Sequence, residues 1–215
     1  VTSKAFPQLF LSDIVDLDTP QENQLKEQVQ KTIQKINRYQ AISGGIAYWP
    51  SGDPDKWTTN YVGHFMLEAK EKSYQLPFGF LSKWKSYQKE EARKWTETPR
   101  ESDFVQAYRL YTLVLAGEAE VAAMNRLKNK TDLSSKAKAR LALAYARLGQ
   151  ESTAEKLVQE FSNSQISETE YRYTYGSKLR DLAMILETYV SIKDEQMNSL
   201  AEEVSQILSS DEWLH

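Results

Sequence analysis

Two kinds of apolar segment alternate along this chain, and this alternation constrains the fold more than any other feature. A helix with a single apolar stripe keeps one face in water, whereas a helix that is apolar nearly all round needs neighbours on every side. The sequence therefore predicts an all-α fold in which buried helices form one layer and exposed helices wrap it. The stripes are Leu25, Val29, Ile33, Ile36 and Met197, Leu200, Val204, Ile207; the segments apolar all round are Trp57–Ala69, Phe104–Ala116 and Leu179–Val190.

Length and composition exclude several classes of protein. No polar tract divides the 215 residues, so we expect a single helical domain over residues 1–215. The 27 basic and 30 acidic residues are mixed throughout, which argues against nucleic acid as a partner. Without cysteine the chain has no disulfide, thiolate metal site or thiol nucleophile. Its apolar runs are far shorter than the roughly 20 residues of a membrane-spanning helix.

Turn residues and possible caps divide the chain into ten expected helices and one loop. Residues 43–54 hold three glycines and two prolines around a short aromatic segment, which predicts a hairpin-like loop. Asp103 is the expected N-cap of Phe104–Ala116, which ends before Gly117, and Thr58 or Asp55 is the possible N-cap of Trp57–Ala69. The expected helices are Ser3–Val15, Pro20–Ile42, Trp57–Ala69, Phe80–Trp95, Phe104–Ala116, Glu118–Lys128, Ser135–Leu148, Thr153–Phe161, Gly176–Ile192 and Asp194–Leu208.

The aromatic residues in and after this loop are the candidate site. Tyr48, Trp49, Trp57 and Tyr61 either present rings to a partner or pack beneath the loop, and packing is favoured because aromatic residues dominate core energetics. Trp57 and Tyr61, like Leu110, are expected in the inner helical layer. His64 lies in the same apolar helix and has no second histidine near it in sequence, so we expect a hydrogen-bonded core histidine.

No constellation for catalysis stands out. Carboxylate pairs occur at Asp53/Asp55, Glu90/Glu91 and Glu202/Glu203, but polar helix faces account for them. The chain has no phosphate-binding glycine loop, no nucleophile elbow and no metal-binding His-Glu-x-x-His motif. We therefore expect no enzyme activity, no cofactor and no metal site.

Several stretches together resemble the thioester-containing domain of bacterial alpha-2-macroglobulin-like proteins. Their order and spacing cover nearly the whole chain, and the resemblance implies an α/α-toroid of the terpenoid-cyclase type. The matching stretches are residues 2–7 (TSKAFP), 44–50 (GGIAYWP), 57–61 (WTTNY), 108–113 (YRLYTL), 115–117 (LAG), 123–127 (AMNRL), 141–145 (LALAY), 175–177 (YGS) and 179–181 (LRD).

The resemblance also implies a function. Members of that family trap proteases: cleavage of a bait region exposes an internal Cys–Gln thioester, which acylates the attacking protease. The family's Cys-x-Glu-Gln motif stands directly before the stretch that Thr2–Pro7 resembles, so the thioester itself would lie outside this chain. Tyr48, Trp49, Trp57 and Tyr61 would then surround the thioester or contact a protein.

The expected context follows from the same resemblance. The expected partners are target proteases and other domains of the same polypeptide, in the periplasm or at the cell surface, with or without a membrane anchor. Because Val1 is not a methionine and Trp213–His215 resembles the lead-in to a further helix, we expect the toroid to be incomplete. The apolar faces of Phe6–Ile14 and Leu182–Tyr189 would then lack neighbours and promote self-association.

Two other classes of function remain open. The same architecture, with the exposed aromatic pair Tyr48 and Trp49, suits a carbohydrate-active enzyme that uses two carboxylates. The segments Ser135–Leu148 and Thr153–Phe161 resemble a generic helix pair, as in a helical-repeat scaffold that binds other proteins.

Overall fold

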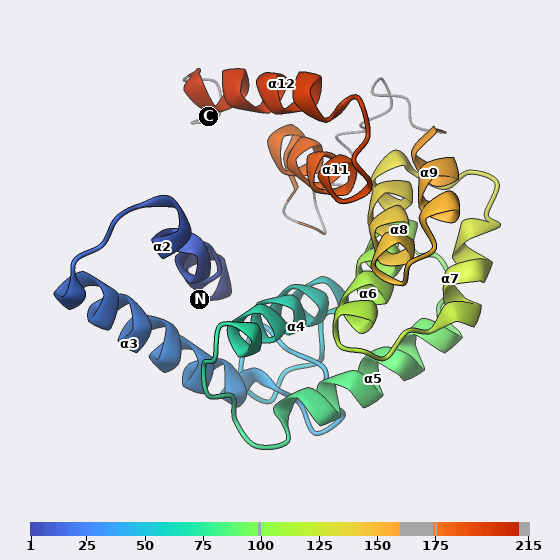
Figure 1. The fold of residues 1–215 in the computed structure, drawn as a ribbon. Helices are drawn as coiled ribbons and strands as arrows, with labels where there is room; N and C mark the ends of the chain where they lie inside the picture. Colours follow the sequence, from blue (N-terminus) through green and yellow to red (C-terminus); the bar gives the residue numbers. More distant parts are fainter. Residues whose placement is uncertain (99, 160–173, 175, 211–215) are drawn as a thin grey trace. The chain divides into compact units, whose positions relative to one another are not determined.

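The computed structural model describes residues 1–98, 100–159, 174 and 176–210, and it separates into two compact units, residues 1–91 and 92–215. Every regular element among the described residues is a helix (Figure 1), which confirms the all-α class. The first unit contains α1 (Thr2–Ala5), η1 (Pro7–Phe10), α2 (Leu11–Ile14), α3 (Thr19–Ile36), η2 (Asn37–Tyr39), α4 (Lys56–Glu71) and the greater part of α5 (Phe80–Lys94). The second contains α6 (Asp103–Leu115), α7 (Val121–Lys128), α8 (Ser135–Arg147), α9 (Glu151–Gln159), α11 (Lys178–Ile192) and α12 (Met197–Ser209).

The first expected helix, Ser3–Val15, is wrong as one continuous element. The chain forms α1, then the 3-10 helix η1 with Pro7 at its first position, then the short α2. Proline lacks the backbone N–H that would bond one turn back, and its ring clashes with that turn, so a helix begun at Thr2 cannot continue through Pro7. Ile14, on α2, is 80% exposed. Leu9 is buried and Phe6 packs against the core, so the expectation that the whole apolar face of Phe6–Ile14 lacks neighbours is wrong for these two residues. Self-association stays a prediction.

Helix α3 begins with a capping box and ends earlier than Pro20–Ile42 predicts. The Asp18 side chain accepts from Gln21 N at 2.8 Å, and Asp18 N donates to the Gln21 side chain at 3.0 Å. The apolar stripe of the helix stops at Ile36, and in the next turn Tyr39 is only partly buried against the core. The backbone tightens into η2, and Ile42 beyond it is fully exposed.

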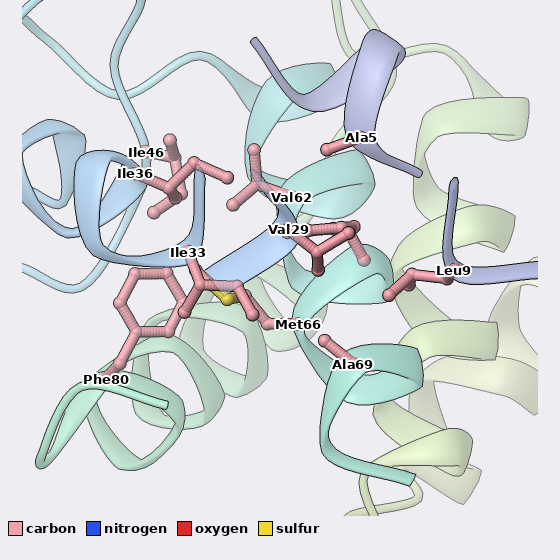
Figure 2. Close-up of a cluster of buried hydrophobic side chains, with 11 residues drawn as sticks. Ala5, Leu9, Val29, Ile33, Ile36, Ile46, Val62, Met66, Ala69 and Phe80 are labelled. Atoms are coloured by element: carbon pink, nitrogen blue, oxygen red, sulfur yellow. The ribbon is translucent and has the colours of Figure 1, made fainter. Parts of the chain in front are cut away.

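The core of the first unit lies between α3, α4 and the N-terminal segment. Figure 2 shows the side chains of these elements pointing toward one another, with Phe80 from the start of α5 at one side. The stripe predicted on α3 supplies Val29, Ile33 and Ile36 to this cluster, whereas Leu25 stays partly exposed. The N-terminal segment is anchored by Ala5 and Leu9, which are both buried there.

A close approach fixes α5 against α4 within the first unit. Trp84 is fully buried, and its indole Nε1 donates to the backbone oxygen of Thr59 at 2.9 Å. Its ring occupies the space over Gly63, where an added Cβ would lie 2.1 Å from the indole. Glycine is therefore required at position 63 by contact between the helices.

Helix α8 is the centre of the second unit. It packs against α6, α9 and α11, and α11 in turn packs against α12. Residues on nearly every side of α8 are buried, although the apolar pattern did not mark it as covered all round. Conversely, the prediction that Leu179–Val190 is covered on every side is wrong: Leu182 and Tyr189 are buried, but Ala183 is exposed and Val190 is 53% exposed.

Charged side chains of α8 and α11 lie against an aromatic stripe of α6. The Lys136 ammonium and the Arg180 guanidinium lie 5.5 and 5.4 Å from the centre of the Phe104 ring. Both cations face Asp181, with Arg180 at 2.6 Å and Lys136 at 3.7 Å from its carboxylate. Along the same helices, Arg140 lies over Tyr108 and Tyr111 and pairs with Glu187 at 2.6 Å.

The helix ends of the second unit show one correction to the predicted caps. The N-cap of α6 is Ser102, whose hydroxyl accepts from Val105 N, and Asp103 is the first helical residue. Asp103 instead accepts from the backbone N (2.6 Å) and hydroxyl (3.0 Å) of Ser134, the N-cap of α8. It thereby ties the starts of two helices together. Gly117 ends α6 with φ +72°, as predicted.

We expect Gly63→Ala to lower the free energy of unfolding by about 1–3 kcal/mol, because the methyl group overlaps the Trp84 ring. Urea unfolding followed by circular dichroism measures the loss. Trp84→Phe replaces the overlapping indole by a smaller ring and also destabilises the protein by itself. The double variant Gly63→Ala/Trp84→Phe should therefore lose less free energy of unfolding than the sum of the losses of the two single variants. Strictly additive losses would contradict the close contact.

Asp181→Asn should lower the free energy of unfolding by about 3 kcal/mol or more, because it removes the carboxylate that faces the buried Lys136 and the half-buried Arg180. The matched control is Glu203→Gln, which breaks an exposed pair with Lys178 and should cost about 0–1 kcal/mol. The same urea titration compares the two variants. Equal effects would show that the buried charges do not stabilise the second unit.

Candidate functional site

The loop before α4 is hairpin-like, as the glycine and proline pattern predicts. Two isolated antiparallel bridges, Gln40 with Ile46 and Ala47 with Pro54, hold it closed. Gly44 turns the chain with φ +99°, and a Cβ there would lie 2.2 Å from the backbone oxygen of Lys83. Both the left-handed conformation and the close contact require glycine.

Hydrogen bonds join this loop to the first turn of α4. The Asp55 carboxylate accepts from Thr58 N at 2.7 Å, so Asp55 is the N-cap between the two alternatives. The Ile46 N–H donates to the Thr59 hydroxyl at 2.9 Å, and Asp55 N donates to the Ile46 oxygen at 2.8 Å. The loop is therefore held at a fixed position relative to the helix.

Tyr48 and Trp49 form an exposed aromatic pair on the loop. Their ring centres lie 6.4 Å apart, and Trp49 is 65% exposed. The Trp49 indole lies against Gly52, where an added Cβ would be 2.7 Å from Nε1, and Gly52 N donates to the Trp49 oxygen at 3.1 Å. Contact on one side therefore holds the ring in place while much of its surface faces solvent.

Trp57 and Tyr61 form a second pair, one turn apart on α4. Their rings stack at 6.5 Å and 9°, and Trp57 is 8% exposed, as expected of a core residue. Leu110 of the second unit is fully buried, which also agrees with its prediction. Tyr61 is only partly buried, so its assignment to the core is wrong in part. Burial nevertheless raises the pKa of the Tyr61 phenol.

Phe6 of the N-terminal segment lies beside these rings and was not among the predicted site residues. Phe6, Trp57, Tyr61, His64 and Phe65 are called the aromatic row below. Its ring lies 5.3 Å from Tyr61, 5.0 Å from His64 and 5.8 Å from Phe65. The one available signal was that Phe6 belongs to the matched stretch Thr2–Pro7. Four aromatic rings and one imidazole thus follow α4 from its first turn, and one of the rings comes from the start of the chain.

The remaining candidate groups have structural partners. His64 is largely buried, with Nε2 3.4 Å from the Glu68 carboxylate. Of the carboxylate pairs, Asp55 caps α4, and Glu91 is buried in an ion pair with Lys56. Within the part of the chain that the structure describes, no three acidic or histidine side chains gather as metal ligands. Tyr175 of the matched stretch 175–177 lies outside the described residues.

We expect Trp57→Ala to lower the free energy of unfolding by about 3–5 kcal/mol, because it empties a buried site and removes the stack with Tyr61. Trp49→Ala is the matched control, since the same change at an exposed position should stay within about 0.5 kcal/mol. Guanidinium unfolding followed by circular dichroism compares the two. A loss at Trp49 as large as that at Trp57 would show that the loop ring is also part of the core.

Comparison with known proteins gives relatives of one kind. No family model matches the sequence. A curated alpha-2-macroglobulin homolog of Yersinia pestis is 26% identical over 174 residues, which is 74% of this chain and 8% of that protein. Native Escherichia coli alpha-2-macroglobulin, solved from domain MG7 to the C-terminus, has a TM-score of 0.83 at 20% identity over 95% of this chain and 35% of that chain. Salmonella alpha-2-macroglobulin reacted with methylamine has a TM-score of 0.83 at 21% identity, over 95% and 14%.

These likenesses agree with the matched stretches along the sequence. The structural similarity shows a shared all-α fold, although this chain spans 8% of its curated relative and about a third of the Escherichia coli chain. In the described residues, no helix is both long and apolar enough to cross a bilayer. The resemblance seen in the sequence is confirmed: the chain is similar to bacterial alpha-2-macroglobulins in sequence and in fold.

Proposed function

We propose that this chain is the scaffold of a thioester domain in a protease-trapping alpha-2-macroglobulin, and that it is not itself an enzyme. Two relatives support the chemistry. The Salmonella protein was solved after reaction with methylamine, a small amine nucleophile, and an Escherichia coli structure is of the trypsin-activated protein. In the proposal, a Cys-x-Glu-Gln motif precedes Val1 in the parent polypeptide.

The single observation that carries this proposal is the contact of Phe6 with α4. Phe6 holds the N-terminal segment against Tyr61, His64 and Phe65, and the buried Trp57 stacks on Tyr61. A motif that directly precedes Val1 would therefore end a few residues before an apolar, aromatic surface. Such a surface excludes water, and a reactive acyl group needs this protection from hydrolysis.

The chemistry of the proposed trap needs no catalytic residue in this chain. The cysteine thiol displaces ammonia from the glutamine side chain and forms the thioester. When protease cleavage exposes the thioester, a lysine amine of the protease attacks its carbonyl carbon, an amide bond forms, the carbon–sulfur bond breaks, and the cysteine thiol is released. The contribution of this chain is to position the thioester and to exclude water from it until the protease cleaves the parent protein.

The exposed pair takes a different part in the proposal. Tyr48 and Trp49 lie on a loop that hydrogen bonds fix to α4, and they present aromatic surface to solvent. Aromatic residues with one accessible face are typical of protein contacts. We therefore assign them to contact with another domain of the parent protein or with the trapped protease, in the periplasm or at the cell surface.

The parent protein gives the direct test. Incubation with trypsin should produce a covalent adduct that survives denaturing electrophoresis, together with one new free thiol per chain. Treatment with methylamine beforehand should prevent the adduct, because the amine consumes the thioester. Absence of both adduct and thiol would overturn the proposed function.

A second measurement tests the role of the aromatic row. In the absence of protease, Phe6→Ala in the parent protein should speed the spontaneous appearance of the thiol, because water reaches the thioester more easily. Phe78→Ala is the control, since this phenylalanine is fully exposed and lies outside the row. If the two variants hydrolyse at the same rate, Phe6 does not shield the thioester.

A further inference from the structure

A second surface feature of the first unit lies away from the aromatic row. A hollow of about 1190 Å³ runs along α3, and its other wall is made by η1, α2 and residues 72–75 after α4. Its lining reaches from Glu22 to Arg38, which is about 24 Å along a helix. That length matches about seven residues of extended polypeptide.

The charges in this groove are unequal, although the whole chain carries a net charge of −3. Lys26 pairs with Glu22 at 3.4 Å, and Lys31 pairs with Glu27 at 2.7 Å. Lys72, on the opposite wall, pairs with Asp13 at 2.7 Å. Each carboxylate at the groove thus faces a lysine that neutralises it.

Two cations remain at one end. Lys35 and Arg38 line the groove near the C-terminal end of α3, and they form no ion pair with any described residue. The groove therefore carries a local positive charge on a chain that is acidic overall. This charge is complementary to carboxylates.

Four glutamines, Gln8, Gln30, Gln34 and Gln75, line the groove beside its apolar residues and can bind a peptide backbone. The side-chain amide of Gln30 makes two hydrogen bonds to the backbone of Gln75. It donates to the Gln75 oxygen at 2.8 Å and accepts from the Gln75 N–H at 3.2 Å. Gln8 and Gln34 also line the groove, and their side-chain amides make no hydrogen bond to described residues. Free amides can pair with backbone N–H and C=O groups in the same way.

Tyr74 also lines the groove, with Lys26 and Lys72 near its phenol. Burial raises the pKa of its phenol, and the ammonium groups of Lys26 and Lys72 oppose that rise.

We propose that this groove binds an extended acidic polypeptide segment. The carboxylates of the segment would lie over Lys35 and Arg38, and its backbone would pair with Gln8 and Gln34. The inference is independent of the thioester proposal, because it uses neither the aromatic row nor the loop at residues 43–54.

The probe is a fluorescent peptide of about eight residues in which glutamate alternates with alanine and both ends are capped. Its binding to the protein is measured by fluorescence anisotropy at low and high salt. We expect saturable binding that weakens with salt, and binding at least about tenfold weaker for a peptide with glutamine in place of glutamate. Equal affinity for the two peptides would overturn the proposal.

Two variants locate the site. The charge reversal Lys35→Glu/Arg38→Glu should weaken binding by about tenfold or more, whereas Lys70→Glu/Lys156→Glu, which makes the same change of charge outside the groove, should leave it within about twofold. Ser12→Trp narrows the groove without changing its charge and should also weaken binding. Circular dichroism checks that each variant is folded. If the control reversal weakens binding equally, or Ser12→Trp binds normally, the groove is not the site.

Discussion

The structure depends on one constraint: a helix covered nearly all round must find partners for its polar groups inside the protein. In the first unit, the Asn60 side chain accepts from Gln88 at 2.6 Å, and Trp84 bonds to the backbone of α4. In the second unit, Asp181 and Glu187 face the cations of α8. Burying these helices therefore requires specific hydrogen bonds and ion pairs, and the same interactions decide how neighbouring helices align.

The aromatic row depends on the same constraint. Because α4 is tied to the loop through Thr59 and Asp55, its first turn cannot shift without breaking those hydrogen bonds. Trp57 and Tyr61 are thus held where Phe6 can reach them. The break at Pro7 matters as well, since a continuous helix would carry the N-terminal segment past α4 in a different direction.

The part of this arrangement that local chemistry controls could be predicted. Asp55 and Gly117 act through neighbours within a few residues, and the pattern of small polar residues and glycine located both, with Thr58 left as the alternative to Asp55. The contacts of Phe6 could not be found in this way, because they join residues about 55 positions apart in sequence. Asp103 was misplaced for a related reason. Its carboxylate is engaged by Ser134 of another helix, which leaves Ser102 as the cap.

The N-terminal segment links the two surfaces of the first unit. Phe6 belongs to the aromatic row on α4, whereas Gln8 and Ser12, only one or two turns later, line the groove along α3. Leu9 lies between them and is buried in the core with Val29. The segment consists of very short helices, and few backbone hydrogen bonds hold such pieces in place. Its position therefore depends on side-chain contacts with α3 and α4, and both surfaces are complete only while those contacts persist.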